Sequence, residues 1–464
     1  MKIILILVML IFSTLSLNAQ QVTGQWNGLL EVQGMKLRLV FNVTKTDSGY
    51  TSTMDSPDQG AKNIPVTKTT FEDPKIKFEI KNIGAEYIGN LREDTIIGTF
   101  KQGGQEFSMD LSRDEIEKVE VRRPQEPKEP YPYYSENVTF KNPVAGISLA
   151  GTLTLPEKKG KFPVVILISG SGPQNRNEEL MGHKPFLVIS DYLTRNGIGV
   201  LRYDDRGVGE STGDFGAATS ADFATDVESA IQYLKSRKEV DKKNIGLVGH
   251  SEGGIIAPMV ASQTDDVSFI VLLAGTGIPG DELLLMQQEL IWRASGMPES
   301  DIERLIQINE ELFKVMVKSN DLDRLEEDLT HTLTEIFEKD TSLVPEGATI
   351  EDLVEVQISQ FLSPWMQYFI KYNPAPALEK VDCPVLAING EKDLQVPPKE
   401  NLEAIEIALK KGGNDQVTTM EIENLNHLFQ ESETGSPDEY AAIEQTFSPV
   451  ALEVILKWIK TQVE

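Results

Sequence analysis

Residues 249–253, with the sequence Gly-His-Ser-Glu-Gly, carry the clearest chemical signal in the chain. They follow the apolar run 245–248 and precede small and apolar residues that begin at Gly254. A serine on a sharp strand-to-helix turn projects its hydroxyl from the end of a sheet, and the flanking glycines make such a turn sterically feasible. We therefore expect Ser251 to be a nucleophile at the positive end of the following helix.

A second stretch, residues 209–213, has the same glycine and serine spacing, with the sequence Gly-Glu-Ser-Thr-Gly. It follows the charged residues 204–208 and leads into Asp214, so we expect neither a strand before it nor a packed helix after it. The context favours Ser251, and the alternative for either serine is a structural position in an ordinary turn.

A serine hydroxyl needs a base at neutral pH, and the chain has four histidines for that role. His250 adjoins the serine at a turn that directs neighbouring side chains apart. His183 precedes a predicted helix well upstream, and His331 lies in a helical region. His427 follows the last predicted strand, in a loop that can return to the same sheet edge, so we expect it to be the base.

The imidazole also needs a carboxylate that orients it and stabilises its charged form. Asp393 follows the apolar run 385–389 and lies between the serine and the histidine in the chain. This order of the three residues differs from both familiar protease orders and is the one found in α/β-hydrolases. Glu391 and Asp382 are the alternatives to Asp393.

A carbonyl oxygen under attack needs two backbone N–H donors, and the loss of one such donor costs about a hundredfold to a thousandfold in rate. We expect one donor from Glu252, directly after the serine. The other is expected from Ser171, with Gly172 as its neighbour, in a glycine-rich loop after the first predicted parallel strand. The alternative for this loop is a plain glycine turn.

The elements that must position these residues fall into distinct regions. Residues 20–114 alternate apolar and polar positions between turns, which predicts a small all-β barrel or sandwich. Residues 115–134 are charged and rich in proline, which predicts an extended, semi-rigid linker. Residues 135–464 contain apolar runs separated by helical segments, which predict a mostly parallel sheet flanked by helices.

Residues 278–378 interrupt the predicted strands and have a helical pattern. Residues 300–303 have the sequence of a capping box ahead of apolar residues near helical spacing. We expect a helical cap over one edge of the sheet; the alternative is a helical domain without a role in the site. Trp365 and Phe369, near the return to the sheet, either line the substrate pocket or belong to the core. The predicted strands are residues 138–140, 147–155, 164–169, 198–203, 245–249, 269–274, 385–389 and 418–422.

Composition and the N-terminal residues limit the partners and the compartment. The 72 acidic residues outnumber the 44 basic ones, and the formal charge of −28 disfavours nucleic acids and anionic membranes as partners. Residues 1–19 combine Lys2, an apolar run and a small-residue cleavage pattern ending at Ala19. We therefore expect a signal peptide and export to the periplasm or the extracellular space, with no membrane span elsewhere. The chain has a single cysteine, Cys383, which excludes an intrachain disulfide.

Several of these segments together resemble the secreted bacterial α/β-hydrolases similar to the EstD esterases, which lie near the serine aminopeptidases. The resemblance covers roughly residue 138 to the C-terminus, and many members also have a β-rich N-terminal region that begins like residues 24–26. It implies the α/β-hydrolase fold and carboxylesterase activity on short acyl chains, with the Asp-Arg-Gly loop as structural support beside the site. Ser169 departs from the wider superfamily, where a histidine often precedes the oxyanion glycine. The shared segments are residues 169–173, 203–211, 249–254, 390–397 and 426–427.

These observations predict a serine esterase that cleaves short-chain acyl esters through an acyl-enzyme. The alternatives are a serine peptidase or amidase with the same triad, and a non-catalytic glycan- or lipid-binding protein. The expected partner is a small-molecule or polymer-linked ester, and no dinucleotide fingerprint, phosphate-binding loop or metal-ligand spacing calls for a cofactor or metal. The role of the N-terminal domain is open between substrate recognition, shielding of the site and formation of a homodimer.

Overall fold

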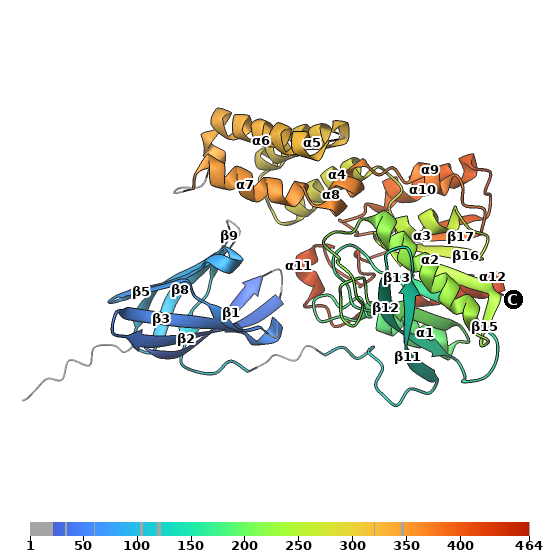
Figure 1. The fold of residues 1–464 in the computed structure, drawn as a ribbon, viewed down its shortest axis with the longest axis horizontal. Helices are drawn as coiled ribbons and strands as arrows, with labels where there is room; N and C mark the ends of the chain where they lie inside the picture. The colour runs from blue at the N-terminus through green and yellow to red at the C-terminus, as the bar shows by residue number, and fades with distance from the viewer. Residues whose placement is uncertain are drawn as a thin grey trace, which may run out of the picture. The chain divides into compact units, whose positions relative to one another are not determined.

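The computed structural model describes residues 22–32, 35–59, 61–102, 105–117, 122–319, 321–344 and 348–463. The chain divides into two compact units, Met1–Glu120 and Val121–Glu464, each with its own sheet and hydrophobic core (Figure 1). The expected signal peptide, residues 1–19, lies outside the described residues. In the described ranges, no helix combines the length and the apolar character that crossing a bilayer requires.

The first unit is an antiparallel sheet that closes on itself. Its strands pair in the order β10-β1-β2-β3-β5-β6-β7-β8-β9, with β4 on β3. Leu111 of β10 lies opposite Gly28 of β1 and also opposite Ile96 of β8, which closes the ring. The expectation of a separate all-β barrel is confirmed. The elements are β1 (Gly24–Val32), β2 (Met35–Thr46), β3 (Gly49–Ser56), η1 (Pro57–Gln59), β4 (Ala61–Pro65), β5 (Lys68–Glu72), β6 (Lys75–Ile80), η2 (Lys81–Ile83), β7 (Ala85–Arg92), β8 (Thr95–Gln102), β9 (Gln105–Ser108) and β10 (Leu111–Ser112).

Aromatic side chains fill the inside of this barrel. Phe41 and Phe78 stack with their ring centroids 4.5 Å apart, and Tyr87 packs against both rings. Trp26 is fully buried and donates its indole N–H to the carbonyl of Val22 at 2.7 Å. Successive side chains of a strand point to opposite faces, so the alternating sequence pattern gathers its apolar members into this core.

The second unit contains a sheet in the order β11-β12-β14-β13-β15-β16-β17-β18. β11 (Tyr134–Asn142) and β12 (Ile147–Leu155) are antiparallel, and β12 is also antiparallel to β14 (Gly199–Tyr203). All later pairs are parallel. Because β13 (Phe162–Ile168) lies between β14 and β15 (Val240–His250), the strand order reverses at β13. Ligands of such sheets bind at the carboxyl ends of the strands at this point. The other strands are β16 (Phe269–Leu273), β17 (Val385–Gly390) and β18 (Val417–Ile422).

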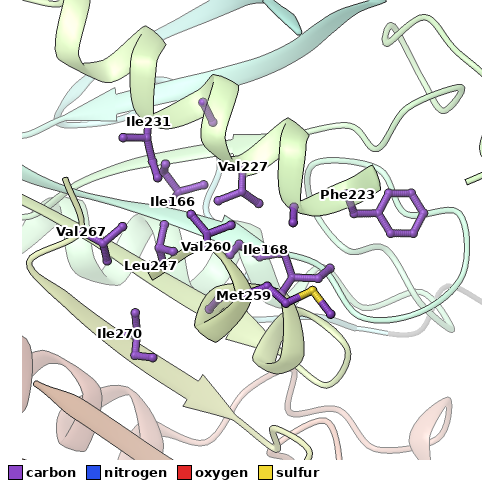
Figure 2. Close-up of a cluster of buried hydrophobic side chains, with 14 of the residues drawn as sticks. Ile166, Ile168, Phe223, Val227, Ile231, Leu247, Met259, Val260, Val267 and Ile270 are labelled. Carbon is purple, nitrogen blue, oxygen red and sulfur yellow. The ribbon is translucent and has the colours of Figure 1, made fainter. Parts of the chain in front are cut away.

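Helices cover both faces of this sheet, because alternate residues of its apolar strands enter two separate hydrophobic clusters. On one face, Val227 of α2 and Val260 of α3 pack with Leu247 of β15 (Figure 2). The helices that cover the sheet on this face include α2 (Ser220–Ser236), α3 (Gly253–Ala261) and α10 (Pro398–Lys411). Those of the opposite cluster are α1 (Pro185–Arg195) and α12 (Pro449–Val463), and the short α11 (Pro437–Tyr440) precedes α12 in the chain.

The interval between β16 and β17 is helical and has a hydrophobic cluster of its own. The capping box expected at residues 300–303 is wrong. Helix α5 begins at Glu299 after Pro298, so Ser300 lies inside the first turn and caps nothing. Pro298 fixes its own backbone angle and has no N–H, which suits the residue just before a helix. The elements are α4 (Gly280–Ala294), α5 (Glu299–Lys318), α6 (Leu322–Lys339), η3 (Thr341–Leu343), α7 (Ile350–Phe361), α8 (Pro364–Lys371) and α9 (Ala375–Leu378).

Candidate active site

Ser251 occupies the sharp turn between β15 and α3. Its φ of 52° lies in the left-handed region, and its N–H donates to the carbonyl of Leu273 in β16 at 2.9 Å. A Cβ on Gly249 would lie 2.0 Å from the carbonyl oxygen of Gly253, and a Cβ on Gly253 would lie 2.2 Å from that of Ile168. Only glycine fits at these two positions, so the glycine spacing is a steric requirement of the turn.

The structure brings Asp393 and His427 together across 34 residues of sequence. His427 Nδ1 lies 2.8 Å from Asp393 Oδ2, and both side chains are buried. Asp393 Oδ1 accepts the N–H groups of Gln395 at 2.8 Å and Val396 at 2.9 Å. The carboxylate can only accept from the imidazole, so Nδ1 carries the proton and Nε2 is left to take one from a serine hydroxyl.

The two alternative carboxylates lie elsewhere. Glu391 is exposed, and its Oε2 accepts the N–H of Asn424 at 2.8 Å. Asp382 is also exposed and precedes β17, at the opposite end of that strand from Asp393. Neither has the contact with His427 that Asp393 makes, so the geometry favours Asp393 as the third member.

The glycine-rich loop after β13 runs beside the nucleophile. A Cβ on Gly170 would lie 3.2 Å from Ser251 Cβ. The N–H of Gly170 is already used, because it donates to a carboxylate oxygen of Glu178 at 2.8 Å. Within the described part of the chain, the N–H groups of Ser171, Gly172 and Glu252 donate to no acceptor. The predicted donors are therefore available to a substrate oxygen.

Asp205 accepts hydrogen bonds from both ends of this loop. Its Oδ1 accepts the hydroxyl of Ser169 at 2.8 Å, and its Oδ2 accepts the N–H of Gln174 at 2.9 Å. Burial outweighs these hydrogen bonds and raises the pKa of Asp205 to about 8. The preceding Asp204 pairs with Arg176 at 2.6 Å. The Asp-Arg-Gly segment thus has the supporting position that the family resemblance implied.

Ser211, in the second glycine-serine-glycine stretch, is part of the same support. Its hydroxyl donates to the carbonyl of Asp204 at 2.7 Å and accepts the N–H of Ala150 in β12 at 2.9 Å. The residue is buried. Its hydroxyl therefore connects the loop that contains Asp204 to β12.

The side chain of Glu252 links the nucleophile turn to the helical insertion. Its Oε1 accepts the hydroxyl of Ser220 at 2.5 Å and the indole N–H of Trp365 in α8 at 2.8 Å. Burial raises the pKa of this carboxyl. Trp365 stacks on Phe369 at 4.9 Å, and Phe369 belongs to the core.

Two buried residues of the site were not predicted to contribute to it. His250 Nδ1 lies 2.9 Å from Glu178 Oε1, and His250 Nε2 lies 3.1 Å from the carbonyl oxygen of His427. The rings of His250 and His427 are 4.9 Å apart. The sequence gives no signal for Glu178, and His250 was set aside because it adjoins the serine.

The other two histidines lie outside this arrangement. His183 is buried, with Nε2 2.8 Å from the carbonyl oxygen of Tyr440, and burial lowers its pKa to about 4. His331 is exposed on α6, 3.1 Å from Glu335. No cluster of three or more histidine, cysteine or acidic residues suited to a metal ion occurs among the residues that the structure describes.

Comparison with known proteins finds similarity to serine hydrolases and esterases. Residues 185–328 match the family model described as serine aminopeptidase, S33. The chain is 28% identical over 294 residues to Esterase EstD of Thermotoga maritima, which covers 63% of this chain and 61% of EstD. The match thus spans about three fifths of the length of this relative. The strand order of the second unit, with β12 antiparallel to both neighbours and the later pairs parallel, is that of the α/β-hydrolase fold. Together the matches support a serine hydrolase or esterase in general.

Two further similarities are shorter or weaker. The chain is 28% identical over 148 residues to Dipeptidyl-peptidase 5 of Porphyromonas gingivalis, which covers 30% of this chain and 20% of that protein. Among solved structures, the Pyrococcus furiosus esterase Pf2001 aligns with a TM-score of 0.43 and 15% identity. That alignment covers 74% of this chain and 98% of the esterase.

Proposed function

We propose that the protein is a carboxylic ester hydrolase that cleaves short-chain acyl esters through an acyl-enzyme on Ser251. The observation that carries the proposal is the 2.8 Å contact of His427 with Asp393, at the same sheet edge as a serine in a glycine-flanked turn. The similarity to Esterase EstD supports an ester as the substrate.

In the proposed reaction, His427 Nε2 takes the proton of Ser251 while Oγ attacks the ester carbonyl carbon. The N–H groups of Glu252 and of Ser171 or Gly172 stabilise the negative charge on the carbonyl oxygen. His427 then gives its proton to the leaving alcohol oxygen as the C–O bond breaks. Water, deprotonated by the same imidazole, attacks the acyl-enzyme, which releases the acid and restores the serine.

The helices α4 to α8 are proposed to form a cap that shapes the substrate pocket. The hydrogen bond from Trp365 to Glu252 supports this role, because it joins α8 to the residue directly after the nucleophile. Export of the protein, and a small-molecule or polymer-linked ester as its substrate, are part of the same proposal. They rest on the sequence of residues 1–19 and on the family resemblance.

A serine peptidase or amidase is the second candidate. The match to the serine aminopeptidase family model and the similarity to Dipeptidyl-peptidase 5 favour it. Both candidates use the same triad, so the substrate separates them. Higher kcat/KM on aminoacyl p-nitroanilides than on p-nitrophenyl esters of the same acyl group would replace the esterase proposal by this one.

Replacing the nucleophile tests the proposal directly. We expect Ser251→Ala to lower the turnover of p-nitrophenyl acetate by at least about a thousandfold and to abolish labelling by a fluorophosphonate probe. The matched control is Ser211→Ala, which removes the serine of the second stretch and its two hydrogen bonds. We expect a lower thermal midpoint for this variant, with fluorophosphonate labelling of Ser251 intact. Turnover or labelling retained by the Ser251 variant would contradict the assignment.

A further inference from the structure

We propose that Glu178 and His250 are positioning residues that hold the oxyanion loop and the loop of the base in register with the nucleophile. The proposal rests on the proposed function, because it concerns how the same triad is aligned. It gives a role to two buried polar residues that take no part in the proton transfers.

The two residues form a chain of contacts between two loops of the site and the end of β15. Glu178 Oε1 accepts the N–H of Gly170 at 2.8 Å and lies 2.9 Å from Nδ1 of His250. At the other side of the ring, His250 Nε2 lies 3.1 Å from the carbonyl oxygen of His427. Gly170 itself packs against Ser251. The loop after β13, the end of β15 and the loop after β18 are therefore joined through Glu178 and His250.

The partners of His250 favour the imidazolium form of its ring. One nitrogen faces a carboxylate and the other faces a backbone carbonyl, so both nitrogens are donors. Burial opposes the charge, but Glu178, the carbonyl of His427 and the nearby Asp393 outweigh it and raise the pKa of His250. The imidazole of His427 and the ring of Phe429 also face His250, at 4.9 and 6.4 Å.

The backbone of Glu178 supports a requirement for its side chain. Its φ of 51° lies in the left-handed region, which glycine adopts without steric cost and residues with a long side chain adopt rarely. Residues persist in such conformations when their surroundings hold them, and they cluster at functional sites. Glycine would relieve the backbone, and the two contacts of the carboxylate are the reason that we propose for a glutamate here.

Small displacements of aligned groups cost much of an enzyme's rate: a shift of about 1 Å can cost about a hundredfold. We therefore expect Glu178→Gln, His250→Asn and His250→Gln each to lower kcat by about 10-fold to 100-fold. The KM should stay within about twofold, because the misaligned donors act mainly on the transition state. Glu178→Gly, which removes the carboxylate and relieves the backbone, should lose as much kcat.

The two histidine variants separate the two contacts. Asparagine keeps a donor near the position of Nδ1, facing Glu178, whereas glutamine keeps one near the position of Nε2, facing the carbonyl of His427. Asn414→Ala is the matched control. Asn414 is as buried as His250 and donates to the carbonyls of Val381 and Cys383 at 2.8 Å each. These residues lie at the amino ends of β17 and β18, whereas the expected triad lies at the carboxyl ends of the strands.

The experiment uses the full chain and p-nitrophenyl acetate. Each kcat is divided by the concentration of sites titrated with a fluorophosphonate, and thermal midpoints are recorded in parallel. A residue with a structural role alone lowers the thermal midpoint and the concentration of titrated sites, but it leaves kcat per titrated site within about twofold. We expect this result for Asn414→Ala. That result for the Glu178 and His250 variants overturns this proposal alone. A wild-type protein that neither turns over the ester nor reacts with the probe overturns the proposed function and this inference with it.

Discussion

Asp393 is held mainly by the backbone of its own loop. One carboxylate oxygen accepts two N–H groups and the other faces His427, so the side chain cannot rotate without losing hydrogen bonds. This arrangement fixes the imidazole before a substrate arrives, which is the contribution expected of the third triad member.

Asp393→Asn tests that contribution. If the amide oxygen keeps both backbone contacts, the NH₂ group faces His427 Nδ1 and can only donate to it. The proton of the imidazole then lies on Nε2, which is the wrong tautomer for a base. We expect kcat for p-nitrophenyl acetate to fall by about 10⁴-fold, with the fold intact by circular dichroism. Glu391→Gln is the control and should stay within twofold. Equal losses in both variants would show that the wrong carboxylate has been assigned.

The residues predicted from sequence and those missed differ in a physical way. Ser251 is recognisable because its turn imposes glycines at fixed spacing, and Asp393 and His427 because strands precede them. Glu178 lies in a charged stretch typical of an exposed loop, and its partner His250 is 72 residues away. A contact between two loops over that separation depends on the packing of the whole sheet.

At the scale of elements, the loop after β13 depends on Asp205, which is buried at its base. Its folded pKa of about 8 lies above that of an unfolded aspartate, about 3.9. The folded protein therefore binds the extra proton between these values, and this contribution to the free energy of unfolding is lost as pH rises from about 4 to about 8.

Asp205→Asn removes this ionisation and keeps an oxygen for Ser169 or Gln174. We expect the decrease in thermal midpoint between pH 5 and pH 8 to be smaller in this variant than in the wild type, measured by calorimetry. Asp214→Asn, at an exposed aspartate, should follow the wild-type curve. Parallel curves for the wild type and the Asp205 variant would contradict the raised pKa.

The start of α3 is packed backbone to backbone. A Cβ on Gly254 would lie 2.5 Å from the Cα of Gly275. We expect Gly254→Ala to lower the free energy of unfolding by about 1–3 kcal/mol, because either α3 or the segment after β16 must move. In Gly216→Ala the added Cβ meets only Asp214 Oδ1 at 3.5 Å, an ordinary contact. Gly216→Ala should therefore leave the free energy of unfolding almost unchanged. Urea denaturation of both variants measures this free energy.

Elements were predictable where the sequence pattern reflects local burial. All eight strands expected for the second unit occur, because buried strands require continuous or alternating apolar runs. The start of α5 was not predictable from its capping sequence, since Pro298 sets the entry to the helix. The hydrogen bond from Trp365 to Glu252 could not be predicted either, because it joins segments 113 residues apart in the sequence.

At the scale of the whole molecule, the two units have separate cores and the expected triad belongs to one of them. Trp26→Ala empties the centre of the barrel, at a cost of about 3–5 kcal/mol. We expect calorimetry to show one transition moved to lower temperature, while kcat per titrated site stays within twofold. Ile97→Ala, at an exposed position of the same barrel, should move neither transition. A matching loss of kcat would show that catalysis depends on the barrel.

The proline-rich segment ahead of β11 bears on how the second unit can be recombined with other domains. Arg123 donates to the carbonyls of Ala441 and Ile443, at 2.8 and 2.5 Å, and Gln125 accepts the N–H groups of Thr446 and Phe447, at 2.6 and 3.1 Å. These residues belong to the second unit in space although they precede its first strand. A fusion joined at β11 would lack Arg123 and Gln125, so the loop between α11 and α12 would lose these hydrogen bonds. A fusion joined upstream of Arg122 would keep them.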